Sequence, residues 1–284
     1  MNRYLFASIF AVMFILSAFV TAYAEEHLLF MAGAAAAPVV EELAKAFENK
    51  TGVKVDVSVG GSGMLLSQIK LAKKGDVYFP GSIDFIDQAR REGHIDESTI
   101  TPIVYLVPSI NVQRGNPKGI RNLKDLCQPG LKIAIANPES VCLGVFGTEL
   151  FEKHFTVEEK QALRKNLVTY TESCEKTATA ISLKAVDAII GWSVFEHWSP
   201  DLIETVKLDH EEIIRISYLG VAVTKYAQNP ETARKFIEFM KSDEGLKFFR
   251  RYKYFITPQE AFAYVGAEKP VGGEPFAVPT DWMK

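Results

Sequence analysis

The chain has 284 residues, 48% hydrophobic and 24% charged, a composition near the average of soluble globular proteins that excludes a fibrous or disordered class. This length suits two lobes, each with its own core. With 32 Lys and Arg against 35 Asp and Glu, the net charge of −3 indicates no basic surface, so we expect no nucleic acid as a partner.

Residues 1–24 are predicted to be a secretory signal peptide. Arg3 supplies a positive charge, residues 4–20 are almost wholly apolar, and Ala22-Tyr23-Ala24 has the small-x-small pattern of a cleavage site. A transmembrane anchor is the alternative, but the apolar run is at the lower limit of spanning length and ends in the cleavage motif. We therefore expect cleavage after Ala24 and a free periplasmic protein, since no cysteine stands at the cut for lipid attachment.

From residue 28 onward, short apolar runs alternate with amphipathic segments, which is typical of strands and helices in a parallel α/β sheet. The pattern predicts strands at 28–31, 53–59 and 76–79, each followed by a helix, the third of which is capped by Asp84 and runs through Arg91. A long β-type run over 101–112 then leads the chain from a first lobe to a second one.

The second lobe repeats this alternation. Strands are predicted at 131–136, 167–171 and 186–190, with helices at 123–127, 144–154, 157–166 and 175–183. Residues 216–224 form another β run that returns the chain, and 230–252 are predicted as the longest helix. Four prolines after residue 256 predict a tail that wraps the surface with little regular structure. The expected division is therefore 25–107 for lobe 1, 108–215 for lobe 2, and 216–284 for a return to lobe 1 with a C-terminal helix and the wrapping tail.

Three loops that lead from a strand to a helix are rich in small residues: 33–37, 60–63 and 137–144. Ligands of open parallel sheets bind beyond the carboxyl ends of the strands, where helix N-termini present N–H groups that have no partner in the helix. None of the three loops contains Lys or Arg, so they could hold an oxyanion through backbone N–H groups, neutral hydroxyls and helix dipoles. For any single loop, a tight turn is the simpler explanation.

A series of short motifs follows a recognisable order along the chain: Thr51-Gly52-Val53-Lys54-Val55, Gly61-Ser62-Gly63, Asp76-Val77-Tyr78-Phe79, Asn137-Pro138-Glu139-Ser140-Val141 and Val186-Asp187-Ala188-Ile189-Ile190. Over residues 28 to 255 this series resembles the periplasmic molybdate- and tungstate-binding proteins of ABC transporters. The resemblance implies a type II periplasmic-binding-protein fold, in which two lobes joined by two crossover strands close over one small anionic ligand. It also implies a monomer whose partner is an ABC permease at the membrane.

The resemblance implies a set of ligand contacts, which transfer to this chain position by position as Ala34 or Ala35, Ser62, Leu143, Thr177 and Trp192. Only Ser62 keeps the hydroxyl of the family pattern. The alanines replace a hydroxyl residue, Trp192 replaces a tyrosine, and Cys142 replaces a usual proline. The resemblance makes molybdate or tungstate the leading ligand class, and these departures keep a small carboxylate or a phosphorylated metabolite as the alternative. Trp192 is either a ligand contact or a buried packing residue.

The chain has three cysteines in a compartment that favours disulfides. Cys142 and Cys174 are expected in loops on the ligand side of lobe 2, next to Leu143 and Thr177, and they are the candidates for a disulfide. Cys127 would then remain unpaired. Other pairings, or a thiol pair that binds a soft metal or metalloid, stay open.

An enzymatic function is not expected. The five histidines show no zinc-binding spacing, and the chain has neither a Gly-x-Ser-x-Gly motif nor a Walker motif, so we expect no catalytic residue, metal or cofactor. The fold does host some enzymes, which keeps catalysis as a minor alternative. An exported antigen or adhesin is a third class, which a neighbouring permease and ATPase would distinguish from a transport protein.

Overall fold

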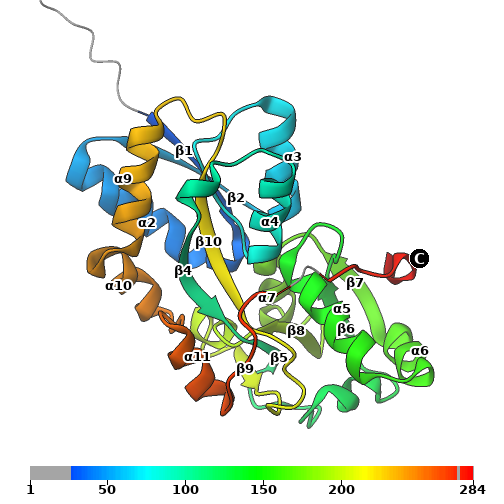
Figure 1. Ribbon diagram of the computed structural model, residues 1–284. Coiled ribbons are helices and arrows are strands. Elements are labelled where there is room, and N and C mark those ends of the chain that lie inside the picture. Colours follow the sequence, from blue (N-terminus) through cyan, green and yellow to red (C-terminus); the bar gives the residue numbers. More distant parts are fainter. Residues whose placement is uncertain (1–26, 274–275, 284) are drawn as a thin grey trace, which may run out of the picture.

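The computed structural model describes residues 27–273 and 276–283, and the predicted signal peptide lies outside these residues. Two five-stranded sheets, each flanked by helices, form two lobes (Figure 1). This confirms the α/β two-lobe fold class. Within residues 27–273 and 276–283, no helix combines the length and apolar character that crossing a membrane requires.

Lobe 1 is built on the sheet with strand order β2-β1-β3-β10-β4. β1 pairs in parallel with β2 and β3, whereas β10 runs antiparallel to both β3 and β4. The strands are β1 (His27–Gly33), β2 (Lys54–Gly60), β3 (Val77–Phe79), β4 (Thr101–Leu106) and β10 (Ser217–Val223). The accompanying helices are η2 (Ala34–Ala36), α2 (Ala37–Thr51), α3 (Ser62–Ala72), α4 (Ile83–Arg91), η3 (Glu97–Thr99), α9 (Pro230–Lys241) and α10 (Asp243–Arg251).

Lobe 2 has the strand order β7-β6-β8-β5-β9, with β6 parallel to β7 and β8, and β5 antiparallel to β8 and β9. Its strands are β5 (Pro108–Gln113), β6 (Ile133–Ala136), β7 (Leu167–Thr171), β8 (Ala188–Trp192) and β9 (Ile203–Val206). Its helices are η4 (Leu123–Cys127), α5 (Cys142–His154), α6 (Val157–Asn166), α7 (Cys174–Ser182) and α8 (Phe195–Trp198). The chain crosses between the lobes from β4 to β5 and returns from β9 to β10.

Local signals explain how the first unit forms. Pro38 lies in the first turn of α2, where its missing N–H costs no hydrogen bond, and Gly52 ends the helix with a φ of 77°, which favours glycine. Phe30 of β1 and Phe47 of α2 both meet Phe236 of α9 edge-on, with ring centroids 4.9 and 5.0 Å apart. This aromatic cluster holds α2 and α9 against the lobe 1 sheet.

The predicted long helix over 230–252 is wrong, because the chain breaks at Ser242 into α9 and α10. Ser242 has extended backbone angles, and its hydroxyl accepts a hydrogen bond from the N–H of Gly245 as the N-cap of α10. A Cβ atom on Gly245 would lie 2.2 Å from the carbonyl oxygen of Phe239, so glycine permits the close approach of the two helix ends. Likewise, the β-type run over 101–112 divides into β4 and β5 where it passes between the sheets.

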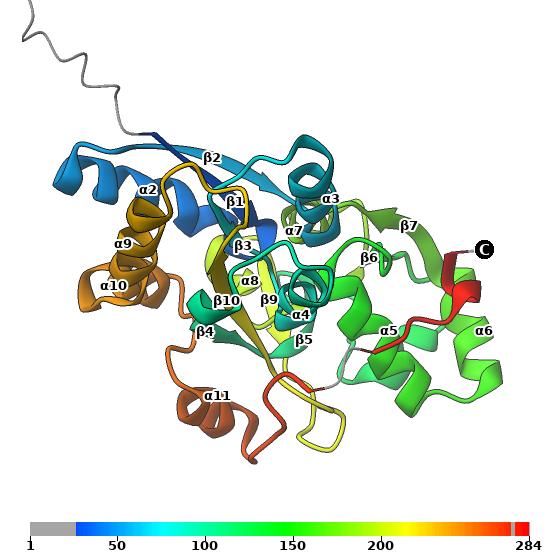
Figure 2. The ribbon, with the colours of Figure 1, turned by 45° about the horizontal axis from the view of Figure 1, so that its top comes forward.

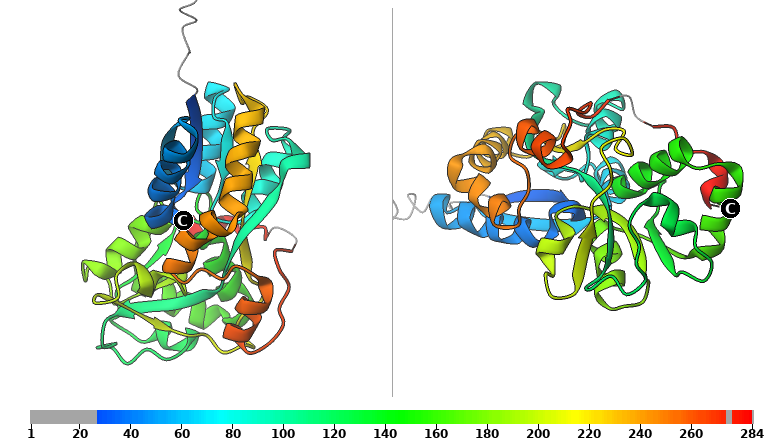
Figure 3. Two further views of the ribbon diagram at one scale, coloured as in Figure 1. Left: turned by 90° about the vertical axis from the view of Figure 1, so that its left-hand side faces the viewer. Right: turned by 90° about the horizontal axis from the view of Figure 1, so that it is seen from below.

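The tail has more regular structure than predicted. It contains α11 (Pro258–Val265) and the short helix η5 (Thr280–Met283). Val271 bridges to Ile216 beside the return crossover, and Trp282 is fully buried on the outer side of lobe 2, stacked on Phe151 with ring centroids 5.5 Å apart. The described parts of the tail thus contact both the crossover and lobe 2 (Figures 2 and 3).

Candidate functional site

The loops at the carboxyl ends of the strands in lobe 1 face the corresponding loops of lobe 2. The N–H of Gly63, at the start of α3, donates a 2.9 Å hydrogen bond to the carbonyl oxygen of Ser140 in lobe 2. A Cβ atom on Gly61 would lie 2.6 Å from the carbonyl oxygen of Glu172. Because backbone touches backbone across the boundary, the structure is the closed arrangement of the lobes.

Ser62 lies at the centre of this boundary, as the first residue of α3, and is 2% exposed. Its Oγ accepts a 3.0 Å hydrogen bond from the N–H of Gly81. Its carbonyl oxygen accepts a 2.8 Å bond from the hydroxyl of Tyr78. Ser62 therefore links two loops of lobe 1 and faces lobe 2.

The alanines after β1 form the tight turn η2, and Ala34 and Ala35 are both buried. The hydroxyl of Tyr254 donates a 2.6 Å hydrogen bond to the carbonyl oxygen of Ala35. Gly81 packs against the same turn, since a Cβ atom there would lie 2.8 Å from the Cβ of Ala35 and 2.6 Å from the Sγ of Cys142. Gly81 and Tyr254 are absent from the predicted site. Pro80-Gly81-Ser82, a fourth small-residue loop between a strand and a helix, was the available signal for Gly81.

Lobe 2 contributes the first turns of α5 and α7. Cys142 and Leu143 begin α5, Cys174 begins α7, and all three are buried. The two sulfur atoms lie 3.7 Å apart as free thiols. Burial raises the pKa of the Cys142 thiol well above its ordinary value, and the contact with Cys174 raises it further. Leu143 lies in the first turn of α5, where backbone N–H groups lack partners within the helix.

Thr177 lies one turn into α7, and its own lobe already uses both of its donors. Its N–H donates to the carbonyl oxygen of Ser173 over 3.0 Å, and its hydroxyl bonds to the same oxygen over 2.9 Å and contacts Thr171. The N–H groups of α7 that precede its first intrahelical bonds belong to residues 174–176, and the Ser173 side chain caps that of Lys176. The start of α7 thus offers a ligand the N–H groups of Cys174 and Glu175 rather than that of Thr177.

Trp192 ends β8 and is fully buried. Its ring packs edge-on against Phe146 of α5 with centroids 5.1 Å apart. In residues 27–273 and 276–283, neither the indole Nε1 of Trp192 nor the hydroxyl of the following Ser193 has a hydrogen-bond partner. A buried donor without a partner costs about 1–3 kcal/mol, so the Trp192 indole and the Ser193 hydroxyl are two donors that an acceptor oxygen could satisfy at this end of β8.

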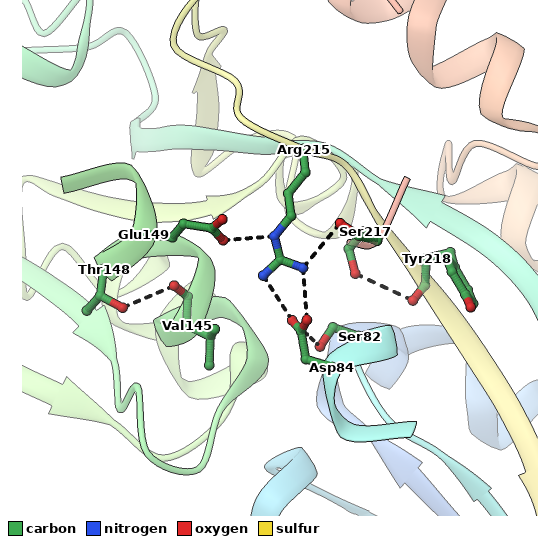
Figure 4. A network of polar contacts seen from close by, with 9 residues as sticks. Ser82, Asp84, Val145, Thr148, Glu149, Arg215, Ser217 and Tyr218 are labelled. Carbon is green, nitrogen blue, oxygen red and sulfur yellow. Dashed lines mark hydrogen bonds and ion pairs between the residues drawn. The ribbon is translucent and has the colours of Figure 1, made fainter. Parts of the chain in front are cut away.

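A buried ion network joins the lobes beside this site (Figure 4). Arg215, which is 4% exposed and precedes β10, binds both carboxylate oxygens of Asp84 at 2.8 and 3.2 Å and the Glu149 carboxylate at 2.8 Å. Asp84 belongs to α4 of lobe 1 and Glu149 to α5 of lobe 2. The guanidinium also lies 4.1 Å from the ring centroid of Phe146. One arginine on the crossover thus holds a carboxylate from each lobe.

The Asp84 carboxylate therefore serves a lobe contact rather than the helix cap that its position predicts. Ser82, the N-cap residue of α4, approaches it with a hydroxyl 3.3 Å from Oδ2. Arg215 is absent from the predicted site, although a charged residue inside the apolar run Ile213-Ile214-Arg215-Ile216 is a signal of a buried ion pair. Burial raises the pKa of the Glu149 carboxyl, while Arg215 opposes this rise.

A hollow of about 200 Å³ opens between the lobes near this network. α4 lines one side with Asp84, Phe85, Gln88 and Arg91, lobe 2 lines the other, and Phe276 and Val278 of the tail complete it. Among the described residues, no group of three or more His, Cys, Asp or Glu side chains is placed to hold a metal ion. Around Ser62, the groups that the lobes bring together are neutral. The charged groups Asp84, Glu149 and Arg215 lie to one side of them.

The sequence is similar to those of bacterial binding proteins. The model of a family described as bacterial extracellular solute-binding protein matches residues 28–254. A protein of Haemophilus influenzae named "Putative binding protein" is 28% identical over 227 residues, which span 78% of this chain and 88% of that protein. The molybdate-binding protein ModA of Rhodobacter capsulatus is 22% identical over 223 residues, or 75% of this chain and 82% of ModA.

The fold also matches a solved structure. PEB3 of Campylobacter jejuni, in a crystal structure with bound L-phospholactate, aligns with a TM-score of 0.63 and 22% identity. The match covers 81% of this chain and 99% of PEB3. At this identity the likeness shows the shared two-lobed fold.

Proposed function

This chain belongs to the family of bacterial extracellular solute-binding proteins, and on that premise we propose that it captures a small oxyanion of the molybdate and tungstate class between its two lobes. The proposal includes export to the periplasm with removal of residues 1–24, action as a monomer, and delivery of the ligand to an ABC permease. Its chemistry is binding rather than catalysis.

The observation that carries this proposal is the convergence of neutral donors at the lobe boundary. Ser62 contributes a hydroxyl beside the start of α3, and the N-termini of α5 and α7 approach from lobe 2. Such helix ends bind anions because their free N–H groups and dipoles provide partial positive charge without a cationic side chain. Ser62, Leu143 and the alanines of η2 are the contacts that we propose on this basis, together with the first N–H groups of α7.

Lobe closure strengthens such a site. The hydrogen bond between Gly63 and Ser140 and the ion pairs of Arg215 hold the lobes together. Closure also removes the ligand from bulk water. Each fixed dipole then acts in a medium of lower dielectric constant, so it attracts an anion more strongly. A ligand that contacts both lobes favours the closed form by its difference in affinity for the two forms, and the closed form is the one presented to a permease.

The similarity to ModA supports molybdate or tungstate as the ligand, whereas two features support a small carboxylate or phosphorylated metabolite as the second candidate. Ala34 and Ala35 lack the hydroxyl of the molybdate pattern, and Trp192 offers a single buried N–H with no partner among the described residues. PEB3, which shares the fold, has bound L-phospholactate. In either case the ligand is an anion with several acceptor oxygens.

A thermal-shift panel tests the proposal. Ligand-stripped protein is heated with molybdate, tungstate, sulfate, phosphate, citrate or phosphoglycerate at matched ionic strength. A ligand at about 100 times its dissociation constant adds roughly 2.7 kcal/mol to the stability of the native state. We expect a clear rise in melting temperature with molybdate or tungstate. A rise with citrate or phosphoglycerate alone would replace the leading ligand class by the second candidate, and no rise with any anion would contradict oxyanion capture.

A further inference from the structure

Cys142 and Cys174 form a pair of thiols at the boundary between the lobes. They are the first residues of α5 and α7, they are 1% and 2% exposed, and their sulfur atoms lie 3.7 Å apart. The third cysteine, Cys127, lies elsewhere, with its thiol donating to the carbonyl oxygen of Glu159 over 3.4 Å. The fold thus brings together two thiols that are 32 positions apart in the chain and leaves the third one separate.

Lobe 1 covers the Cys142 thiol of this pair. Gly81, in the loop between β3 and α4, packs so closely on Cys142 that an added Cβ atom would lie 2.6 Å from the sulfur, and the same Cβ atom would lie 3.5 Å from the Oγ of Ser62. Both residues belong to lobe 1, whereas both cysteines belong to lobe 2. A reagent can therefore reach the Cys142 sulfur only after the lobes have separated.

We propose that Cys142 and Cys174 are a thiol–disulfide exchange site that lobe closure protects and lobe opening exposes to a disulfide donor. In the first step, the thiolate of one cysteine attacks the donor disulfide, forms a mixed disulfide and releases one donor thiol. The thiolate of the second cysteine then attacks the protein sulfur of the mixed disulfide and releases the second donor thiol. The protein pair loses two electrons and two protons, which reduce the donor to two thiols.

The consequence for binding follows from where the two cysteines lie. A disulfide would join the first residues of the two helices whose N-termini face the proposed ligand, and would remove their freedom to move apart. This consequence rests on the proposed function. The exchange reaction itself does not, because it needs no ligand, so a failure of one proposal can be told from a failure of the other.

The site is tested by incubating the reduced protein with oxidised glutathione and then counting thiols and mapping linked peptides by mass spectrometry. We expect the parent protein and Cys127→Ser each to lose two thiols and to yield the linked peptides of Cys142 and Cys174. Cys142→Ser should form no intramolecular bond. Retention of all thiols in the native protein, or linkage through Cys127, would overturn the proposal.

Protection by closure is tested through the rate of the same reaction. Replacing Arg215 by Met removes the two ion pairs that join the lobes. The thiol pair of this variant should therefore oxidise faster than that of the parent, by on the order of tenfold. Asp84→Asn is a milder variant that weakens the same contact and should act in the same direction. Arg234→Met is the control, because Arg234 pairs with Asp96 and Glu231 on the surface away from the boundary. Equal rates in the parent and in folded Arg215→Met and Asp84→Asn would overturn the gating.

Discussion

The buried arginine at the crossover gives the sharpest prediction about stability. Arg215→Met keeps a long apolar side chain but removes the guanidinium that holds Asp84 and Glu149. The side chains of these two carboxylates are 7% and 14% exposed, so water cannot readily replace the lost partner. Breaking a buried ion pair by removing one partner costs about 3–5 kcal/mol, because a charge is left buried without compensation. Because whole domains are stable by only about 5–15 kcal/mol, this loss should be large.

A matched control is available on the surface. Arg234 also binds two carboxylates, those of Asp96 at 2.9 Å and Glu231 at 2.7 Å, but its own side chain is 42% exposed. Solvent screens such pairs, so Arg234→Met should cost only about 0–1 kcal/mol. Urea unfolding of both variants and the parent, followed by far-ultraviolet circular dichroism, measures the difference. A loss in Arg215→Met no larger than that in Arg234→Met would refute the role assigned to the network.

Three further predictions concern single residues of the boundary. Ser62→Ala should weaken binding of the anion identified in the thermal-shift panel by about 1–3 kcal/mol, measured by calorimetry, and should also lower the melting temperature, because the buried N–H of Gly81 loses its acceptor; equal affinity would mean that Ser62 serves only the packing of its loop. Ligand addition should change tryptophan emission, and Trp192→Phe should remove most of this change and weaken binding; a persistent change with unaltered affinity would make Trp192 a packing residue. Burial raises the folded-state pKa of Glu149 above its ordinary value of 4.5, so its contribution to stability is fully present below pH 4.5 and is lost as the pH rises through the raised pKa. As the pH rises from 4.5 to 7, the free energy of unfolding of the parent should therefore fall relative to that of Glu149→Gln. Urea unfolding at several pH values measures both, and a difference that stays constant with pH would contradict this.

Local sequence signals were enough to predict the alternation of strands and helices and the two-lobe class. Strand β1, the turn of alanines and the helix that begins near Pro38 depend on neighbouring residues, so their pattern is visible in the chain itself. The break at Ser242 is also local. The sequence Ser-Asp-Glu-Gly is an N-terminal helix signal there, but the apolar period runs through it and conceals the break.

The contacts that the sequence could not predict are those between distant segments. Arg215 and Asp84 are 131 positions apart, and Tyr254 reaches Ala35 across 219 positions. Only the assembled lobes bring these partners together, so no periodicity or motif indicates the pairs. Thr177 shows the same limit on a smaller scale, because a shift of the helix start to Cys174 uses its N–H inside α7.

Closure of the two lobes over a small oxyanion, at the boundary around Ser62, is the step on which the proposed function depends. Small-angle X-ray scattering measures this closure directly, by comparing the radius of gyration of ligand-stripped protein with that of the same protein saturated with molybdate. We expect a smaller radius with molybdate, and no decrease in Ser62→Ala at a concentration that saturates only the parent. A radius that stays constant while molybdate binds to saturation would contradict capture between the lobes.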